Sequence, residues 1–395
     1  MTIVPLFLLT LGAINWGYVY PLVFLFVALL RQRLLGKEIC FNFLYASSFW
    51  LLLAAGMTYA IIGPRSLLSV YHYGTLPIIA FGIGWILAEG SSDEQIRDGI
   101  LAMIAGFGTY AALNMAVNIG RVRYRLIDFW SRTYRAATGS GVLNTMTICA
   151  MPDIVKCEKR VSVKLLFLAL FVATIHYMFM LGTRTQFAIL LITILLAVLH
   201  FSNREQGSVG IFKFLAIVIV LGAVGFLIYR YDIFSIRSRI LSTNLALRYQ
   251  QRDVLESADT FRLRSVWVGL RELVLYPMGG RAGQVYHHNM WLDVGRVSGV
   301  IPFVLLLTYS IKNFAHVITV CKNRAVLLSL RYLLLFLYIG TYVNFFVEPI
   351  WEGALNLFLA LCVVDGMVSA MIRREGNDSD SENRIPDTSN LHTDL

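Results

Sequence analysis

Residues 163–201, VKLLFLALFVATIHYMFMLGTRTQFAILLITILLAVLHF, decide the fold class. Two apolar runs, 163–181 and 185–201, are separated only by the turn Gly182–Arg184. About 20 apolar residues are enough for one helix to cross a bilayer. We therefore predict two membrane-spanning helices joined by a tight turn, which holds the guanidinium of Arg184 at the membrane surface.

The rest of the chain has the same character. Of its 395 residues, 57% are hydrophobic and only 15% are charged, against roughly 25% charged in soluble domains. This composition excludes a soluble multi-domain enzyme and predicts an all-α, polytopic transmembrane bundle of about 10–12 spans. The predicted spans lie near residues 3–30, 39–62, 69–89, 98–120, 141–155, 163–181, 185–201, 211–229, 290–311, 325–343 and 353–371.

These spans divide the chain into four parts. N-terminal helices over 1–229 and C-terminal helices over 290–371 flank one large loop, 230–289, which lacks a 20-residue apolar run and so lies outside the hydrocarbon. The polar tail, 372–395, is disordered by composition. The apolar start, 3–30, has neither a basic region nor a cleavage site, so we expect the first span, or two short ones, rather than a signal peptide.

Cysteine spacing and net charge exclude further classes. The five cysteines form no CxxC pair, so neither a disulfide framework nor a metal site is predicted, and no cofactor is expected. The net charge of +10 comes from 34 basic residues scattered between apolar runs. Such scattering offers no continuous groove for a nucleic acid.

The basic residues differ between the two predicted sides of the membrane. With Arg373 and Arg374 in the cytoplasm, all seven lysines are cytoplasmic as well, and the outer side carries arginine only. The outer arginines are Arg65, Arg121, Arg123, Arg125, Arg132, Arg135, Arg184, Arg230, Arg237, Arg239, Arg248, Arg252, Arg262, Arg264, Arg271, Arg281 and Arg296.

Positive charge on the translocated side opposes the usual insertion bias. Arginine, unlike lysine, presents a planar fork that binds phosphate with two hydrogen bonds. One interpretation is an outer face that handles phosphate or another polyanion. The alternative is that these arginines reach lipid headgroups or pair with acidic residues such as Asp128, Asp232, Asp253 and Glu256.

Two further motifs follow the Arg184 turn on the outer side. Residues 261–270, FRLRSVWVGL, are typical of an amphipathic helix in the membrane interface and are followed by the turn Pro277–Gly280. This helix is a candidate for chemistry or a simple anchor.

The second motif is YHHNMWLD, residues 286–293, just before a predicted span. Histidine is suited to proton transfer near neutral pH, and polar residues at the start of a span favour a polar cavity. A hydrogen-bonded structural pair is the alternative. A zinc site is disfavoured because no third ligand lies nearby.

The order of these motifs, GTR at the head of a span, R…W…PxGG, then HHN before a late span, resembles the O-antigen polymerase and O-antigen ligase superfamily. These bacterial membrane glycosyltransferases act on glycans linked to undecaprenyl diphosphate. The motif-level likeness runs from about Gly182 to Gly299. It implies a GT-C-like bundle in the bacterial inner membrane, with its active site on the outer face.

The resemblance also implies roles for individual residues. Arg184 matches the arginine at the head of a span, and either Arg262 or Arg264 matches the arginine before the tryptophan Trp267. His288, beside an asparagine, matches the catalytic histidine. The remaining candidates are Arg281 for the diphosphate and, for the sugar, His287, Asn289 and Glu348.

Physical chemistry supports this assignment of roles. Arginine forks stabilise the negative charge that grows on a departing diphosphate, and a neutral histidine accepts the proton of an acceptor hydroxyl. Such a reaction requires no metal, and the one DxD string, Asp378–Asp380, lies in the predicted cytoplasmic tail.

We therefore predict a polysaccharide polymerase that moves a growing glycan from one lipid diphosphate to the non-reducing end of another lipid-linked unit. A ligase that attaches glycan to lipid A-core or to protein is the first alternative, and a lipid-linked oligosaccharide flippase is the second. The expected partners are the lipid-linked donor and acceptor, membrane lipids, a chain-length regulator and a flippase. No nucleic acid is expected.

Overall fold

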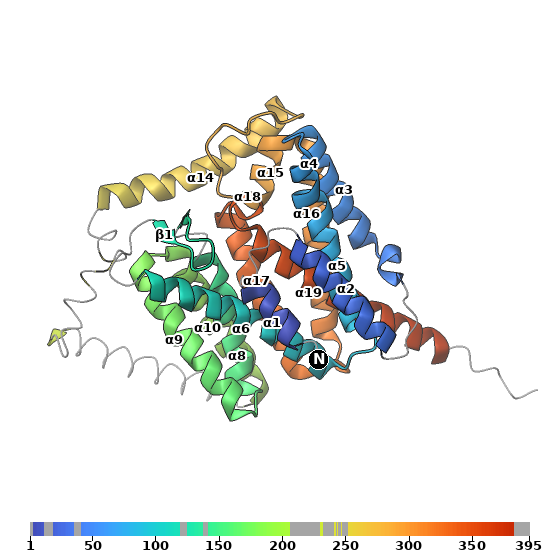
Figure 1. Cartoon of the computed structure of the whole chain (residues 1–395). Coiled ribbons are helices and arrows are strands. Elements are labelled where there is room, and N and C mark those ends of the chain that lie inside the picture. The colour runs from blue at the N-terminus through green and yellow to red at the C-terminus, as the bar shows by residue number, and fades with distance from the viewer. Residues whose placement is uncertain are drawn as a thin grey trace, which may run out of the picture.

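The structure is a computed structural model, in which most of the chain forms helices (Figure 1). It describes residues 3–11, 19–34, 41–118, 125–136, 141–205 and 252–382, with a few isolated positions between 230 and 246. The predicted span 211–229 and the early part of the predicted loop therefore lie largely outside the described residues.

The described helices follow one another with short connections. Their bounds are α1 Ile3–Leu11, α2 Val19–Leu34, α3 Ser47–Ile62, α4 Leu67–Ser69, α5 Leu76–Ala88, α6 Asp93–Val117, α8 Thr145–Lys156, α9 Val161–Leu181, α10 Arg184–Glu205, α14 Arg252–Leu275, α15 Met290–Ser298, α16 Val300–Lys322, α17 Leu328–Val347, α18 Ile350–Gly353 and α19 Leu355–Glu382. A short 3₁₀ helix, Asn42–Tyr45, precedes α3, and a π-helical segment, Val70–Thr75, joins α4 to α5.

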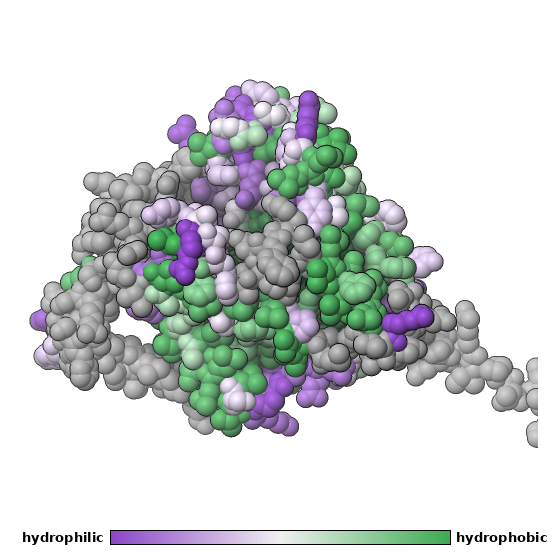
Figure 2. Space-filling model, viewed as in Figure 1, coloured by the Kyte–Doolittle hydropathy of each residue, from purple (hydrophilic) through white to green (hydrophobic). Residues whose placement is uncertain are grey.

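Six of the described helical segments are long and apolar enough to cross a membrane, so the chain is a multi-pass membrane protein. They are Leu67–Ala88, Asp93–Val117, Val161–Leu181, Val300–Lys322, Leu328–Val347 and Leu355–Arg374, with Ser47–Ile62 and Arg184–Leu199 as shorter apolar helices. Figure 2 shows hydrophobic residues over the middle of the visible face and hydrophilic residues gathered at its upper and lower edges, as a membrane belt requires.

Several predicted boundaries were wrong. The first apolar stretch forms two helices, α1 and α2, and α8 is a 12-residue helix too short to span. The predicted span 290–311 is broken at Gly299, which has a φ of +87°. A Cβ there would lie 2.1 Å from the carbonyl oxygen of Pro277, so only glycine fits, and the membrane helix begins at Val300.

The described chain also contains one small sheet that the all-α prediction missed. Strands β1 (Arg125–Ile127) and β2 (Tyr134–Ala136) form an antiparallel hairpin. Asn118, just after α6, holds this hairpin because its side-chain amide donates to the Ile127 carbonyl at 2.8 Å and its amide oxygen accepts from the Ile127 N–H.

The tail prediction needs a correction as well. Helix α19 continues to Glu382, so residues 372–382 are helical, and 383–395 lie outside the described residues. Arg373 and Arg374 anchor this extension, because Arg373 donates to the Asn42 carbonyl at 3.0 Å and Arg374 pairs with Asp93 at 2.9 Å.

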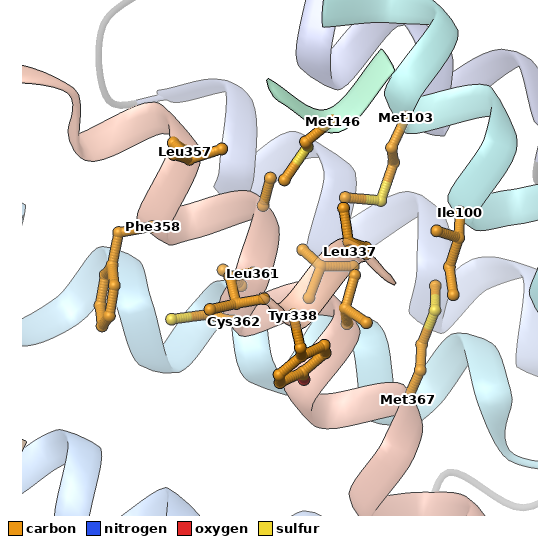
Figure 3. Packing of buried hydrophobic residues seen from close by; sticks show 14 of the residues in the cluster. Ile100, Met103, Met146, Leu337, Tyr338, Leu357, Phe358, Leu361, Cys362 and Met367 are labelled. Atoms are coloured by element: carbon orange, nitrogen blue, oxygen red, sulfur yellow. The ribbon is translucent and has the colours of Figure 1, made fainter. Parts of the chain in front are cut away.

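The helices share one hydrophobic core around α19. Side chains of α6, α17 and α19, among them Ile100, Leu337 and Leu361, are buried against one another (Figure 3). Helix α5 approaches α19 most closely where glycines face backbone: a Cβ on Gly84 or on Gly366 would come within 2.0 Å of the other helix. Small residues permit such close approach inside membranes.

The two ends of the bundle differ in their basic residues. At the lysine end, where α8 and α16 finish, lie Lys156, Lys159 and Lys322. At the arginine end, where α9 finishes and α10 and α16 begin, lie residues such as Arg184 and Arg296. Among the described lysines, none lies at the arginine end, so the predicted separation holds for the part of the chain that the structure describes.

A buried ion-pair network ties the lysine end together. Arg97 of α6 lies 2.6 Å from Asp153 of α8 and 3.0 Å from Glu158 in the next turn. Arg160, at the start of α9, joins Glu158 at 2.9 Å and Asp98 at 2.6 Å. The network therefore fixes three helices to one another.

Candidate functional site

The Arg184 motif forms the predicted turn at the arginine end. Gly182 ends α9 in the left-handed conformation with a φ of +65°, which glycine adopts without strain. The amides of Gly182 and Thr183 both donate to the Met178 carbonyl, at 3.0 and 3.2 Å. Arg184 is half-buried and is the first residue of α10.

The next residue links this turn to the end of α17. The hydroxyl of Thr185 lies 3.3 Å from a carboxylate oxygen of Glu348. Glu348 is only 6% exposed, so it is a buried carboxylate and not the solvated loop residue that was its alternative interpretation. One turn earlier on α17, Asn344 donates to the Thr145 hydroxyl of α8 at 2.6 Å. Helices α8, α10 and α17 thus meet through polar contacts.

The two histidines have different surroundings. His287 is 6% exposed, its Nε2 lies 3.1 Å from Glu272 of α14, and its backbone amide donates to Asp293 at 2.7 Å. His288 is half-buried and has a φ of +54°, a conformation that is uncommon outside glycine. Strained backbone of this kind persists only where the surroundings enforce it, and it clusters at functional sites.

Asn289 begins α15 as its N-cap. Its side-chain oxygen accepts from the Leu292 amide at 3.1 Å, and its amide nitrogen donates to the Phe346 carbonyl at 3.4 Å. N-caps of this type satisfy a backbone donor that the helix itself leaves open. Asn289 is therefore held by both α15 and the last turn of α17.

Helix α14 places the second arginine motif beside the His287 loop. The predicted helix is present, and it ends before the Pro277 turn as expected. Arg264 is exposed, whereas the side chain of Arg262 lies outside the described residues. Ser265, next to Arg264, donates to the His287 carbonyl at 3.0 Å.

Arg281 and Arg296 have partners within the protein. Arg281 lies 3.3 Å from Glu272, and its guanidinium stacks on the Tyr276 ring at 4.5 Å. Arg296 is buried, with its side chain only 1% exposed, and it lies 3.1 Å from Glu352 of α18. These arginines therefore support the site's framework, in line with the ion-pairing alternative for the outer set.

Arg296 organises the loop that carries the histidines. One of its nitrogens donates to three carbonyl oxygens of that loop, at 2.8, 2.9 and 3.1 Å. Glu352 in turn accepts from the Tyr59 hydroxyl of α3 at 2.9 Å. Asp293 is completely buried beside Arg296, and burial raises the pKa of its carboxyl, an effect that its hydrogen bonds and Arg296 oppose.

Sequence reasoning missed three of these supporting residues: Glu272, Arg296 as a clamp, and Glu352. One signal for Glu272 is its helical spacing. Ser265, Gly269 and Glu272 repeat at i, i+4 and i+7, so they share one face of α14, and small residues on such a face favour close contact.

The structure brings the predicted motifs to one end of the bundle. The Arg184 turn and the Asn289 cap both contact the last turn of α17, and α14 contacts His287. In Figure 1, α14, α15 and α18 lie close together at the top of the molecule. Within the described residues, no group of three or more His, Cys, Asp or Glu side chains is arranged to hold a metal ion.

Comparison with known proteins gives no relative. No protein-family model and no curated protein matches the chain. The functional assignment therefore depends on the residues and contacts of the chain itself.

Proposed function

We propose that this chain is a membrane glycosyltransferase that polymerises a surface polysaccharide from units linked to undecaprenyl diphosphate. The observation that carries the proposal is the shared anchor of two motifs. Thr185, next to Arg184, contacts Glu348, and Asn289, next to His288, contacts Phe346. An arginine and a histidine from distant parts of the chain thereby lie on elements that meet at one end of α17.

The proposed reaction uses these two groups in different steps. The anomeric C–O bond of the donor breaks, and its electron pair leaves with the undecaprenyl diphosphate. Arg184, with Arg264 or Arg262 of α14, stabilises the charge on that leaving group. The hydroxyl oxygen of the acceptor sugar forms the new bond to the anomeric carbon, and His288 takes the hydroxyl proton.

The buried carboxylate of Glu348 supports a sugar subsite beside Arg184. Carboxylates accept hydrogen bonds from hydroxyl groups, and Thr185 already supplies one such donor. His287 is tied to Glu272 and Asp293, which favours His288 as the base. Arg281 is paired with Glu272, which favours Arg184 and the α14 arginines for the diphosphate.

Surface chemistry is better supported than transport. A flippase opens alternately to both sides of the membrane, with polar groups at mid-membrane. Here the network of Arg97, Asp153, Glu158 and Arg160 binds three helices together at the lysine end. Opening that end requires breaking buried ion pairs, which costs several kcal/mol.

Purified protein in lipid nanodiscs tests the proposal. With an undecaprenyl-diphosphate-linked repeat unit as both donor and acceptor, we expect products of two or more repeats. Arg184→Ala and His288→Ala should give none, while Arg271→Ala serves as an exposed arginine control. Transfer to lipid A-core but not to a second lipid-linked unit would indicate the ligase instead. Unchanged products from both variants would contradict the site.

A further inference from the structure

The contact between α14 and His287 has a role that the proposed chemistry does not use. Three residues on one face of α14, Ser265, Gly269 and Glu272, reach the His287 loop. Ser265 donates to the His287 carbonyl, Gly269 lies against its ring, and Glu272 faces its Nε2. We call these three residues and His287 the α14 latch.

The latch fits closely because of Gly269. A Cβ at that position would lie 3.1 Å from Cδ2 of His287 and 3.2 Å from a methyl group of Leu292. Contacts this short are tighter than most real ones, so any larger side chain displaces the imidazole. Glycine inside a helix costs roughly 1 kcal/mol relative to alanine, and this contact gives the cost a structural reason.

His288 is held between two fixed neighbours. On one side the latch and Asp293 fix His287, and on the other side Asn289 is fixed by α15 and by the Phe346 carbonyl. His288 spans the gap in a left-handed conformation, with a φ of +54°. Its backbone therefore has little freedom while both neighbours stay in place.

We propose that Glu272 is a positioning residue, which acts through His287 to set the direction of the His288 imidazole. This inference rests on the proposed function, since it assigns His288 as the base. The latch also includes Ser265, the neighbour of Arg264, so one set of contacts holds the α14 arginine and the histidine in a fixed relation. Glu272 receives no direct role toward substrate, because its oxygens face His287 and Arg281.

Kinetics of the full chain in nanodiscs test the positioning role. A displacement of about 1 Å at a catalytic group costs on the order of 100-fold in rate. We expect Glu272→Ala and Gly269→Ala to lower kcat by about this factor and to leave KM for the lipid-linked donor nearly unchanged. Glu272→Gln keeps an oxygen toward His287 and should retain much more activity. Gly283→Ala, which meets no atom within 4 Å, is the matched control.

A chemical readout separates this inference from the proposed function. Diethyl pyrocarbonate acylates accessible, unprotonated imidazole nitrogens, and mass spectrometry assigns each modified histidine. His287 should react slowly in the wild type and severalfold faster in Glu272→Ala, whether or not the chain transfers glycan. Equal His287 rates in both proteins would overturn the latch.

The two readouts together leave no ambiguous result. Faster His287 modification with an unchanged kcat would overturn the positioning role, because the latch would then open without effect on catalysis. A wild-type chain that transfers no glycan would contradict the proposed function, and the His287 rates would still decide whether the latch exists.

Discussion

The hydroxyl of Thr185 lies 3.3 Å from a carboxylate oxygen of Glu348 and so joins the first turn of α10 to the end of α17. Two residues earlier on α17, the Phe346 carbonyl accepts from the Asn289 amide at 3.4 Å. The end of α17 is therefore a common support for two motifs that are far apart in the sequence. The proposed chemistry depends on this support.

Arg184 should be essential for glycan transfer. Loss of one donor that stabilises developing negative charge typically lowers kcat by about 100- to 1,000-fold, and we expect this range for Arg184→Ala. Arg184→Lys should also be poor, because an ammonium group lacks the planar fork that binds phosphate with two hydrogen bonds. Rates with purified variants, at matched membrane levels, check both expectations. A lysine variant with wild-type rates would show that a point charge suffices.

Thr185→Val should destabilise the protein. It removes a hydroxyl donor from the buried Glu348 carboxylate without changing the side-chain shape, and weakening of such a buried group costs about 1–3 kcal/mol. Thr58→Val is the matched control, because the Thr58 hydroxyl bonds only to carbonyls of its own helix. Thermal unfolding in detergent should show a lower midpoint for Thr185→Val than for the control. Equal midpoints would remove this contact from the account.

Arg296→Lys should loosen the loop that carries the histidines. The guanidinium contacts three loop carbonyls and Glu352 at the same time, and an ammonium group has too few donors in the right plane. Breaking a buried pair costs about 3–5 kcal/mol. Hydrogen exchange should therefore accelerate over residues 279–288 and stay unchanged in α9. Wild-type protection over the loop would show that other contacts hold it.

Glu158 should make stability depend on pH in acid. Hydrogen bonds from Arg160, followed by those from Arg97, lower its pKa from 4.5 to about 2. A carboxyl whose pKa is lower in the folded state stabilises the protein above its unfolded pKa. That contribution is present above pH 4.5 and is lost as the pH falls toward about 2.

The difference between wild type and Glu158→Gln isolates this effect. Unfolding midpoints measured from neutral pH down to acid should fall more steeply for the wild type, because glutamine does not titrate. Parallel curves for the two proteins would mean that Glu158 gains no stabilisation from its arginines.

Much of the fold was predictable because a bilayer imposes long apolar helices. The spans around Val161–Leu181 and Leu355–Arg374 follow from hydropathy alone, and so does the turn at Gly182. The hairpin at 125–136 was missed because short polar strands give a weak signal beside strong helix patterns. The break at Gly299 depends on a contact with Pro277, which local sequence does not encode.

The candidate site was predictable only in part. Arg184, His288 and Asn289 belong to motifs that stand out against apolar surroundings. Glu272 and Arg296 were missed as supporting residues because their importance comes from partners distant in the sequence. Composition alone makes every outer arginine look alike, whereas contacts separate those with internal partners from the rest.

The glycan profile of a strain that lacks this chain tests the central claim most directly. The account predicts that such a strain accumulates single-repeat glycan and makes no long polymer. Wild-type chain should restore the polymer, and His288→Ala at equal membrane levels should not. Accumulation of long, unattached polymer in the deletion strain, or polymer of normal length and attachment, would contradict the proposed polymerase.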